Sequence, residues 1–264
     1  MTQDERLDFL IEAFKAEFKE YKKLCVPADR DGRQQFLRAL MNVRMPGLMS
    51  AEVLAVQDAY LRERAEEKGI VDLQDIPVIC EGLSVWQGDI TRLAVDAIVN
   101  AANSAMLGCF VPGHNCIDNC IQTYAGVQMR AECDRQMKLL KREYGQSYVQ
   151  PTAIPLLTDG YNLPAKKVVH IVGPVVTGSL TQKHKTELAA CYTNTLDLCM
   201  RKGLKSLAFC CISTGVFHFP NEEAAEIAVN TVKGWQETHG NAMERIIFNV
   251  FKDEDKKCYE NLMR

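Results

Sequence analysis

From Leu83 to the end of the chain, short apolar runs alternate with longer stretches of helical spacing, and this alternation constrains the fold more than any other feature. Short apolar runs bounded by turn residues are typical of buried strands. The predicted strands are Leu83–Gln87, Ala97–Asn100, Ala153–Leu157, Lys167–Val172, Ser206–Ile212 and Arg245–Phe251. The predicted helices are Ile117–Leu140, which is open to a break at Gly126, Thr181–Lys202, Glu222–Thr238 and Asp253–Met263. Strands that alternate with helices predict an α/β fold of three layers, α/β/α, with helices on both faces of one sheet.

Residues 1–75 have a different pattern, which predicts a helical extension in front of a main domain at residues 76–264. The helices expected there are residues 4–24, Gln34–Met45 and Ala51–Lys68. Ser50 is suited to cap the start of the third helix, and Gly69 to end it. Because the extension carries no cluster of catalytic residue types, we expect an appendage docked on the main domain. The alternative is a lid over the site or a contact surface for a protein substrate.

Composition and charge restrict the class of protein. The 264 residues carry a formal net charge of −3, whereas nucleic-acid-binding domains usually have a strong basic excess. No apolar run reaches the roughly 18–20 residues that a membrane-spanning helix needs, and the polar N-terminus is unlike a signal peptide. The eleven cysteines are irregularly spaced and odd in number, which argues against a disulfide framework. We therefore expect a cytoplasmic protein that binds neither nucleic acid nor a membrane, with most cysteines as reduced thiols.

Polar side chains gather in residues 86–120, just beyond the ends of two predicted strands. Asp89 follows the first of these strands, and the segment Asn100–Asn103 follows the second. A glycine-bearing loop then carries two cysteines and a histidine. In open α/β sheets, ligands bind in the crevice outside the carboxyl ends of the strands. The sequence therefore predicts the active site in this stretch.

The loop offers ligands for a metal ion. Cys109, His114 and Cys116 follow the spacing C-x4-H-x-C, and thiolate and imidazole are favoured zinc ligands. From the residues alone, a zinc site and a reduced cysteine-rich loop without metal are both open. A closed structural site needs a fourth ligand, for which Cys120 and His218 are candidates. We expect an open site with three protein ligands, because the loop directly follows the polar segment described above.

Separated motifs connect the chain to a known family. The motifs are Gly88–Thr91 (GDIT), Asp96–Asn103 (DAIVNAAN) and Ile212–Phe217 (ISTGVF). In their residue types and their order along the chain, these motifs resemble those of the macrodomain family, which binds ADP-ribose. The glycine run that is usual after the second motif is replaced here by Gly108–Cys116. With the N-terminal extension, this departure resembles the microbial zinc-dependent branch, whose members are protein-ADP-ribose hydrolases.

The resemblance implies roles for individual residues. Asp89 and Ile90 would read adenine, through a carboxylate that accepts from the amine and a backbone N–H that donates to a ring nitrogen. Asn103 would orient the distal ribose, while Asn100 holds the loop. The segment Ser213–Phe217 would cradle the diphosphate with its backbone N–H groups. The full set expected to contact ADP-ribose is Asp89, Ile90, Asn103, Cys116, Ile117, Asp118, Ser213, Thr214, Gly215, Val216 and Phe217. Without the resemblance, an ordinary turn at Gly88–Asp89 and a plain surface loop at Ser213–Phe217 would be the favoured explanations.

The resemblance also implies one zinc ion per chain, held by Cys109, His114 and Cys116 beside the anomeric carbon of the distal ribose. Zinc there would either polarise a substrate oxygen or lower the pKa of a bound water. The predicted catalytic residues are Asn103 and Asp118. Asp118 lies near the predicted start of a helix, where a carboxylate is electrostatically favoured. Three roles are equally open for it: capping the helix, orienting a metal-bound water, or contacting the diphosphate.

The leading hypothesis is a zinc-dependent hydrolase, a glycosidase that removes mono-ADP-ribose from modified protein side chains. One alternative is a non-catalytic ADP-ribose reader with a structural zinc, and another is a hydrolase of a free ADP-ribose metabolite. The expected partners are ADP-ribose and a mono-ADP-ribosylated protein. A lipoyl-carrier protein modified by a sirtuin-type transferase is implied by the resemblance alone.

Overall fold

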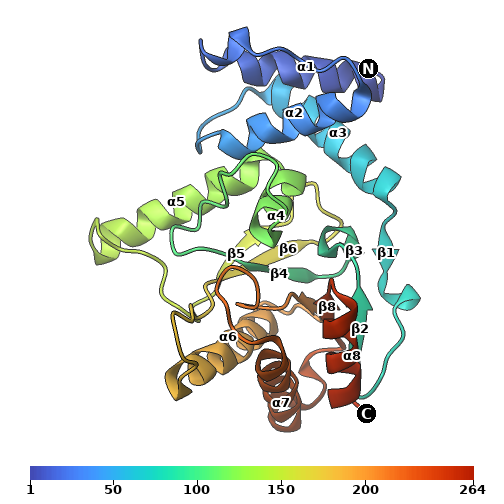
Figure 1. Ribbon diagram of the computed structural model, residues 1–264, viewed down its shortest axis with the longest axis vertical. Coiled ribbons are helices and arrows are strands. Elements are labelled where there is room, and N and C mark those ends of the chain that lie inside the picture. The colour runs from blue at the N-terminus through green and yellow to red at the C-terminus, as the bar shows by residue number, and fades with distance from the viewer.

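A six-stranded sheet forms the middle layer of the computed structural model, which describes residues 1–264 except for the side chain of Asn241 (Figure 1). In spatial order the strands are β2 (Leu83–Gln87), β8 (Arg245–Val250), β7 (Ser206–Phe209), β4 (Ala97–Ala101), β6 (Lys167–Ile171) and β5 (Leu156–Asp159). Neighbouring strands are parallel, except that β5 runs antiparallel to β6 at the edge. The carboxyl ends of the parallel strands therefore meet along one edge of the sheet, where the polar motifs follow.

Helices cover both faces of this sheet, which confirms the predicted three-layer α/β/α fold (Figure 1). The helices are α4 (Ile117–Ala125) and α5 (Val127–Tyr144) on one face, and α6 (Gln182–Arg201), α7 (Asn221–His239) and α8 (Asp253–Leu262) on the other. The helix predicted from Ile117 is indeed broken at Gly126, whose φ of 97° is a left-handed conformation. Glycine adopts such a conformation without steric cost, so Gly126 can end α4 and redirect the chain into α5.

The sheet strands are buried on both faces. In β4, Ala97, Ile98 and Val99 have no exposed surface. A sheet covered on both sides requires continuous apolar runs rather than an alternating pattern, which is why the strands could be predicted from short apolar stretches. This burial stabilises the sheet by about 25 cal/mol per Å² of apolar surface, and it holds the strand ends in place for the polar residues that follow.

The N-terminal extension forms a separate bundle of three helices. They are α1 (Gln3–Ala16), α2 (Arg30–Val43) and α3 (Ala51–Lys68). The bounds of α3 match the prediction, and the Ser50 hydroxyl accepts a hydrogen bond from the Val53 N–H at 3.3 Å. The bundle has a second hydrophobic core, made of Leu7, Leu10, Ile11, Phe14, Leu37, Leu40, Met41, Tyr60, Leu61 and Val127. Because Val127 belongs to α5, this core continues onto the main domain.

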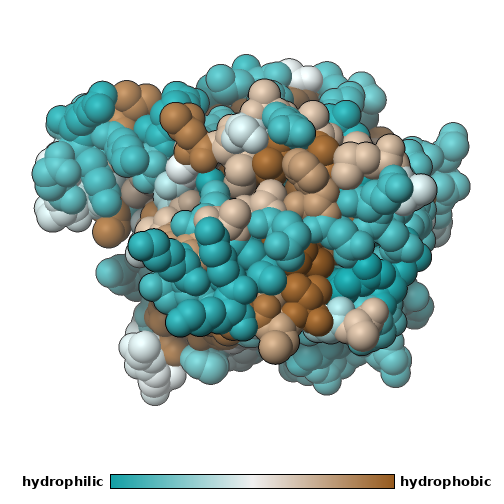
Figure 2. All heavy atoms as spheres, turned by 90° about the horizontal axis from the view of Figure 1, so that it is seen from above, coloured by the Kyte–Doolittle hydropathy of each residue, from teal (hydrophilic) through white to brown (hydrophobic). Residues whose placement is uncertain are grey.

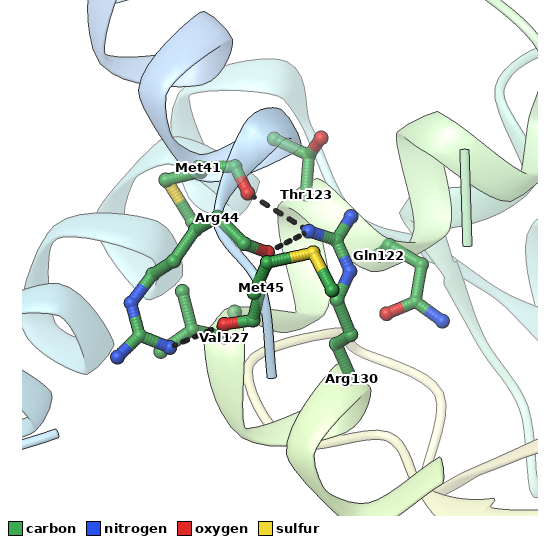
Figure 3. Close-up of a pocket in the computed structure, with 8 residues that line it drawn as sticks. Met41, Arg44, Met45, Gln122, Thr123, Val127 and Arg130 are labelled. Atoms are coloured by element: carbon green, nitrogen blue, oxygen red, sulfur yellow. Dashed lines mark hydrogen bonds between the residues drawn. The ribbon is translucent and has the colours of Figure 1, made fainter. Parts of the chain in front are cut away.

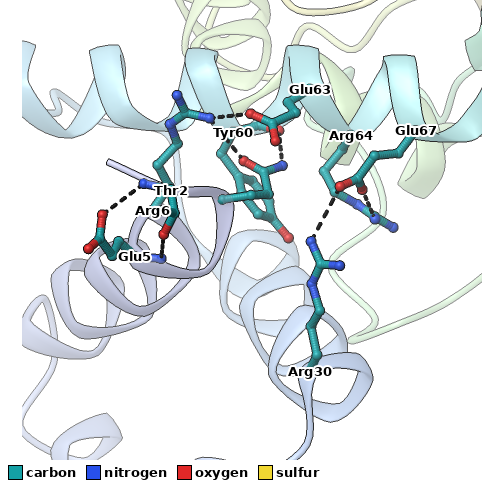
Figure 4. A network of polar contacts seen from close by, with 9 residues as sticks. Thr2, Glu5, Arg6, Arg30, Tyr60, Glu63, Arg64 and Glu67 are labelled. Atoms are coloured by element: carbon teal, nitrogen blue, oxygen red, sulfur yellow. Dashed lines mark hydrogen bonds and ion pairs between the residues drawn. The ribbon is translucent and has the colours of Figure 1, made fainter.

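Ion pairs link the surfaces of the three bundle helices (Figure 4). The Arg30 guanidinium lies 3.1 Å from an Asp4 oxygen and 3.3 Å from a Glu67 oxygen, and Arg6 pairs with Glu63. Pairs this exposed contribute about 0–1 kcal/mol each, so the apolar core supplies most of the cohesion. Seen from above, hydrophilic side chains cover much of the molecule, with apolar side chains gathered near the middle of the face (Figure 2).

Some boundaries differ from the prediction. The first helix ends at Ala16 rather than at residue 24, and only Tyr21–Lys23 forms a further 3-10 turn. The aromatic rings of Phe18 and Tyr21 pack on each other, with centroids 5.0 Å apart. Phe18 is exposed, whereas Tyr21 packs against the core of the bundle. The strand predicted from Ala153 begins at Leu156, because Ala153 has a φ of 63°, which is incompatible with a strand.

Two short strands were not predicted. The strand β1 (Val71–Asp72) pairs in parallel with β3 (Leu93–Ala94), and two residues are too few for any periodic pattern. This pair ties the chain leaving α3 to the main domain. We propose that the two units meet near residue 75, immediately after β1. Among the described residues, no helix combines the length and apolar character that a membrane span requires.

Candidate active site

Polar and aromatic residues follow four neighbouring strands at the carboxyl edge of the sheet. Asp89 follows β2, Phe251 follows β8, Ser213 follows β7, and Asn103 follows β4. The order of the strands in the sheet places these positions side by side. This edge of the sheet is where ligands bind in open α/β folds, and it is the place where the sequence predicts the site.

The Asp89 carboxylate is held from two sides. One oxygen accepts from the Thr91 N–H at 3.0 Å and from the Thr91 hydroxyl at 2.6 Å, and the other accepts from the Lys68 ammonium at 2.7 Å. The Lys68 ammonium also lies 3.4 Å from the centroid of the Tyr124 ring, a cation–π contact. Burial raises the pKa of Asp89, but the hydrogen bonds from Lys68 and Thr91 outweigh it and hold that pKa below its usual value. Asp89 is thus an ionised acceptor with a fixed orientation.

Two further groups beside Asp89 suit a flat heterocycle. The Ile90 N–H has no acceptor among the residues that the structure describes, so it can donate to a ring nitrogen. The Phe251 side chain is 78% exposed, and the Gln87 amide donates to the Phe251 carbonyl at 3.2 Å. An exposed ring at a strand end is suited to stacking. The sequence did not single out Phe251 as a binding residue, because the predicted strand included it, whereas β8 ends at Val250.

A chain of hydrogen bonds leads from the buried core to Asp118. The Asn100 amide donates to an Asp118 oxygen at 2.8 Å and to His170 Nδ1 at 3.0 Å. Because His170 Nδ1 accepts, Nε2 carries the proton, and it lies 2.9 Å from the Thr158 hydroxyl. The Asn103 amide donates to the second Asp118 oxygen at 3.3 Å. The structure therefore brings together Asn103 and Asp118, the two predicted catalytic residues.

Asp118 lies in the first turn of α4 and is buried. Burial raises the pKa of its carboxyl to about 6, although the Asn100 amide and the positive charge of Arg130 lower it in part. Asn103 is positioned by its own loop, since its amide also donates to the Gly108 carbonyl at 3.1 Å and accepts from the Ala105 N–H at 3.0 Å. Asn100 holds Asp118 rather than the loop itself.

The three predicted metal ligands lie together, and their donor atoms are all within 4.8 Å of one another. Cys109 Sγ is 3.6 Å from His114 Nδ1. A tetrahedral zinc ion with bonds of about 2.3 Å to sulfur and about 2.1 Å to nitrogen would separate those two atoms by about 3.6 Å. Two sulfurs and one imidazole at this spacing fit zinc. Burial raises the pKa of the Cys116 thiol, and a zinc ion would displace its proton.

Among the side chains that the structure describes, neither Cys120 nor His218, the two candidates for a fourth ligand, belongs to this cluster. Cys120 lies one turn along α4 from Cys116, but its sulfur accepts a hydrogen bond from Arg38 at 3.6 Å. His218 is exposed, follows the Ser213–Phe217 loop and has a left-handed φ of 57°. The cluster therefore offers three protein side chains that could hold a metal ion.

The predicted diphosphate loop begins at a strained residue. Ser213 has a φ of 66°, and its buried hydroxyl has no partner among the described residues. Gly173, after β6, allows this approach, since a Cβ there would lie 2.1 Å from the Ser213 hydroxyl. The N–H groups of Gly215, Val216 and Phe217 also have no acceptor within the described part of the chain. Unpaired donors around a glycine are suited to an anion.

The remaining residues predicted to contact ADP-ribose differ in their exposure. Thr214 and Phe217 are half-buried, while Gly215 and Val216 are exposed. Ile117 is half-buried and begins α4 directly after Cys116. Among the described residues, no hydrogen bond joins Asp89 or the Ser213–Phe217 loop to the metal cluster, so a ligand would have to bridge them.

Comparison with known proteins identifies the family. Residues 99–228 match the family model of the Macro domain. A protein-ADP-ribose hydrolase of Treponema medium is 49% identical over 267 residues, covering 100% of both chains. A protein-ADP-ribose hydrolase of Staphylococcus aureus (strain MRSA252) is 43% identical and covers 97% of this chain and 94% of that protein. The crystal structure of the Trypanosoma brucei macrodomain in complex with ADP-ribose is similar with a TM-score of 0.65 and 28% identity, covering 86% of this chain and 95% of that one. The family model, the full-length relatives and the similar fold agree, and the chain belongs to the macrodomain family.

Proposed function

We propose that this protein is a zinc-dependent hydrolase that removes mono-ADP-ribose from modified protein side chains. Its classification as an enzyme, a protein-ADP-ribose hydrolase, follows from its full-length relatives of that name. The observation that supports zinc dependence is that the two predicted catalytic residues lie next to the predicted metal ligands. Asn103 donates to Asp118 at 3.3 Å, and Asp118 lies two residues after Cys116 in the predicted ligand set.

The chain's own residues would divide the work along the crevice. Asp89 and the Ile90 N–H would bind the adenine edge, and the exposed Phe251 ring would stack on its face. The unpaired N–H groups of Gly215–Phe217 and the Ser213 hydroxyl would hold the diphosphate. This anchoring would fix the distal ribose within reach of the reacting groups.

At the distal ribose, Asn103 and Asp118 would act together. Asp118 accepts from Asn100 and Asn103, and its remaining lone pairs are free for a ribose hydroxyl or a water molecule. The bond that breaks joins the anomeric carbon to the modified side chain; water adds its hydroxyl to the anomeric carbon, and its other proton goes to the released side chain. When bound to Cys109, His114 and Cys116, zinc would supply a Lewis acid at this end of the crevice.

The partner is proposed at the level of chemistry, as a mono-ADP-ribosylated protein. The names of the relatives give no support to the lipoyl-carrier protein that the resemblance implied, so this partner and its sirtuin-type transferase stay predictions. The cytoplasmic location expected from the sequence also stays a prediction.

The decisive experiment measures single-turnover release of ADP-ribose from a mono-ADP-ribosylated protein. We expect release by the wild type, loss of release with a zinc chelator and loss in Cys116→Ser. Cys25→Ser is the matched control, because Cys25 is an exposed thiol in the extension. Binding of ADP-ribose without release would indicate a non-catalytic ADP-ribose reader. Hydrolysis of a free ADP-ribose metabolite, but not of the modified protein, would indicate a metabolite hydrolase. Full release by zinc-free protein would refute zinc dependence.

A further inference from the structure

The loop that carries the metal ligands is held by the N-terminal extension. Arg38 of α2 donates to the His114 carbonyl at 2.6 Å and to the Asn115 side chain at 3.1 Å. The same guanidinium donates to the Asn119 side chain at 3.0 Å and to Cys120 Sγ at 3.6 Å. One side chain from the extension thus joins the metal loop to the first turn of α4.

A second residue of α2 reaches the same loop. The Asn42 side chain is buried, accepts from the Gly113 N–H at 2.9 Å and donates to the Thr123 hydroxyl at 2.8 Å. Gly113 has a φ of 65°, so this bond supports the loop at its left-handed residue. Asn42 therefore connects the middle of the loop to α4, independently of Arg38.

The helix that carries these side chains is itself anchored to the main domain. Figure 3 shows Arg130 of α5 reaching the carbonyl groups at the end of α2. Its guanidinium donates to the Met41 carbonyl at 3.3 Å, to the Asn42 carbonyl at 2.9 Å and to the Arg44 carbonyl. A buried cation on the last carbonyls of a helix is stabilising. The position of α2, and with it Arg38, is thus set by the main domain.

The metal loop makes few backbone hydrogen bonds within itself, and its Cys109 and Val111 carbonyls accept from the Asn119 side chain of α4 at 3.3 Å and 2.9 Å. Val111, Pro112, His114 and Asn115 are exposed, and the only backbone bond between loop residues in the described structure runs from the His114 N–H to the Val111 carbonyl at 3.2 Å. Ordering a flexible backbone costs about 1–2 kcal/mol per residue. Contacts that order the loop before a metal binds remove part of this cost from the binding step.

We propose that Arg38 and Asn42 are positioning residues that preorder the Cys109–Cys116 loop for metal binding, so that the N-terminal extension is part of the active site. The proposal rests on the zinc site of the proposed function. The contact between Arg38 and Cys120 has a second effect, since it holds the nearest spare thiol away from the three ligands. Neither residue belongs to the proposed ligand set, which is Cys109, His114 and Cys116.

The test compares zinc affinity in Arg38→Gln, Arg38→Lys and Asn42→Ala with that of the wild-type protein, measured by competition with a chromophoric chelator. Loss of a group that orients metal ligands typically weakens metal affinity by about 10–100-fold, and we expect that range for Arg38→Gln. Arg38→Lys keeps the charge but not the planar fork of donors, so we expect an intermediate loss.

The matched control is Arg33→Gln. Arg33 lies on the same helix, but it pairs at the surface with Asp8 of α1 at 2.6 Å and makes no hydrogen bond to the loop in the described structure. We expect wild-type zinc affinity in this variant. The Arg38→Gln substitution is repeated with Cys120→Ser, because a freed Cys120 thiol could replace a lost ligand and mask the effect.

Two further readouts separate positioning from a loss of fold. Circular dichroism and thermal unfolding of the metal-free variants report the fold, which we expect to be retained. The absorption of the cobalt-substituted protein reports ligand geometry, and we expect its thiolate bands to change in Arg38→Gln but not in Arg33→Gln. ADP-ribose affinity should change less than zinc affinity, because the hydrogen-bond partners of Asp89 are Lys68 and Thr91 and do not include Arg38 or Asn42.

The outcomes are distinct. If the wild-type protein binds no zinc, both the proposed metal site and this inference are wrong. If the wild type binds zinc and a folded Arg38→Gln variant binds it equally well with an unchanged cobalt spectrum, the positioning role is refuted while the zinc site stands. A selective loss of zinc affinity in the Arg38 and Asn42 variants, with Arg33→Gln unaffected, establishes it.

Discussion

The buried histidine behind the site makes a testable prediction about stability at low pH. His170 on β6 has no exposed surface, and burial lowers its pKa from 6.5 to about 3. Asn100 donates to its Nδ1 in the folded protein, which requires the neutral ring. In the unfolded chain the same ring takes up a proton at about pH 6.5. Above that pH His170 is neutral in both states, and below it the unfolded state binds more protons.

The sign and size of the effect follow from this difference. Stability rises with pH wherever the unfolded state binds more protons, so the contribution of neutral His170 is complete above about pH 6.5 and is lost as the pH falls toward about 3. Each pH unit within this window costs about 1.4 kcal/mol. His170 alone should therefore lower the free energy of unfolding by about 2 kcal/mol between about pH 7.5 and about pH 5.

The comparison variant is His170→Asn, whose side-chain oxygen can still accept from Asn100 but does not titrate. Urea unfolding at both pH values gives the free energy of unfolding of each protein. Other groups, including Asp118, whose raised pKa acts in the opposite direction, are shared by the two proteins. The difference between the two pH dependences therefore isolates His170. If the wild type and His170→Asn lose the same stability on acidification, the histidine is not buried in its neutral form and the reasoning is wrong.

Four further predictions concern ligand and metal. Asp89→Ala should weaken ADP-ribose binding by about 1–3 kcal/mol, because an acceptor for the adenine amine is lost; calorimetry with unchanged affinity would remove Asp89 from that role. Asp118→Asn should lower single-turnover release by about 10²–10⁴-fold if Asp118 moves a proton in the reaction, with ADP-ribose affinity nearly unchanged; equal losses of both would indicate a binding role. Gly173→Ala should weaken ADP-ribose binding, because its Cβ would displace the Ser213 hydroxyl, whereas Gly234→Ala, with nothing within 4 Å, should not; equal affinities in titrations of the two variants would contradict this. Metal analysis should find about one zinc per chain, lost on replacing Cys109, His114 or Cys116 and kept in Cys120→Ala; a zinc-free Cys120→Ala that still folds would indicate a closed structural site.

The sequence by itself determined the layered fold and much of the predicted site. The strands could be read because burial on both sheet faces requires continuous apolar runs, as in Ala97–Val99 of β4. The three predicted metal ligands all lie within residues 109–116, so a single loop can bring them together. The caps of α3 are local as well, because Ser50 bonds a backbone group three residues away.

The prediction failed where one residue's conformation or packing overrode a local pattern. Ala153 is apolar and precedes a strand, but its left-handed φ delays the strand to Leu156. Phe18 continues the spacing of the first helix, yet it packs on Tyr21 after the helix has ended. Local periodicity predicts on which face of a helix or strand a side chain lies. It does not predict whether another segment packs against that face.

Only the tertiary structure decided which residues support the site. Arg38 lies 81 residues before its partner Asn119, His170 lies 70 residues after Asn100, and Lys68 comes from the end of α3 to hold Asp89. An arginine, a histidine or a lysine on a predicted helix or strand does not by itself indicate which distant residue it contacts. Their roles depend on how the extension docks on α4 and α5 and on the register of β6 beside β4, and both are settled by packing between segments far apart in the chain.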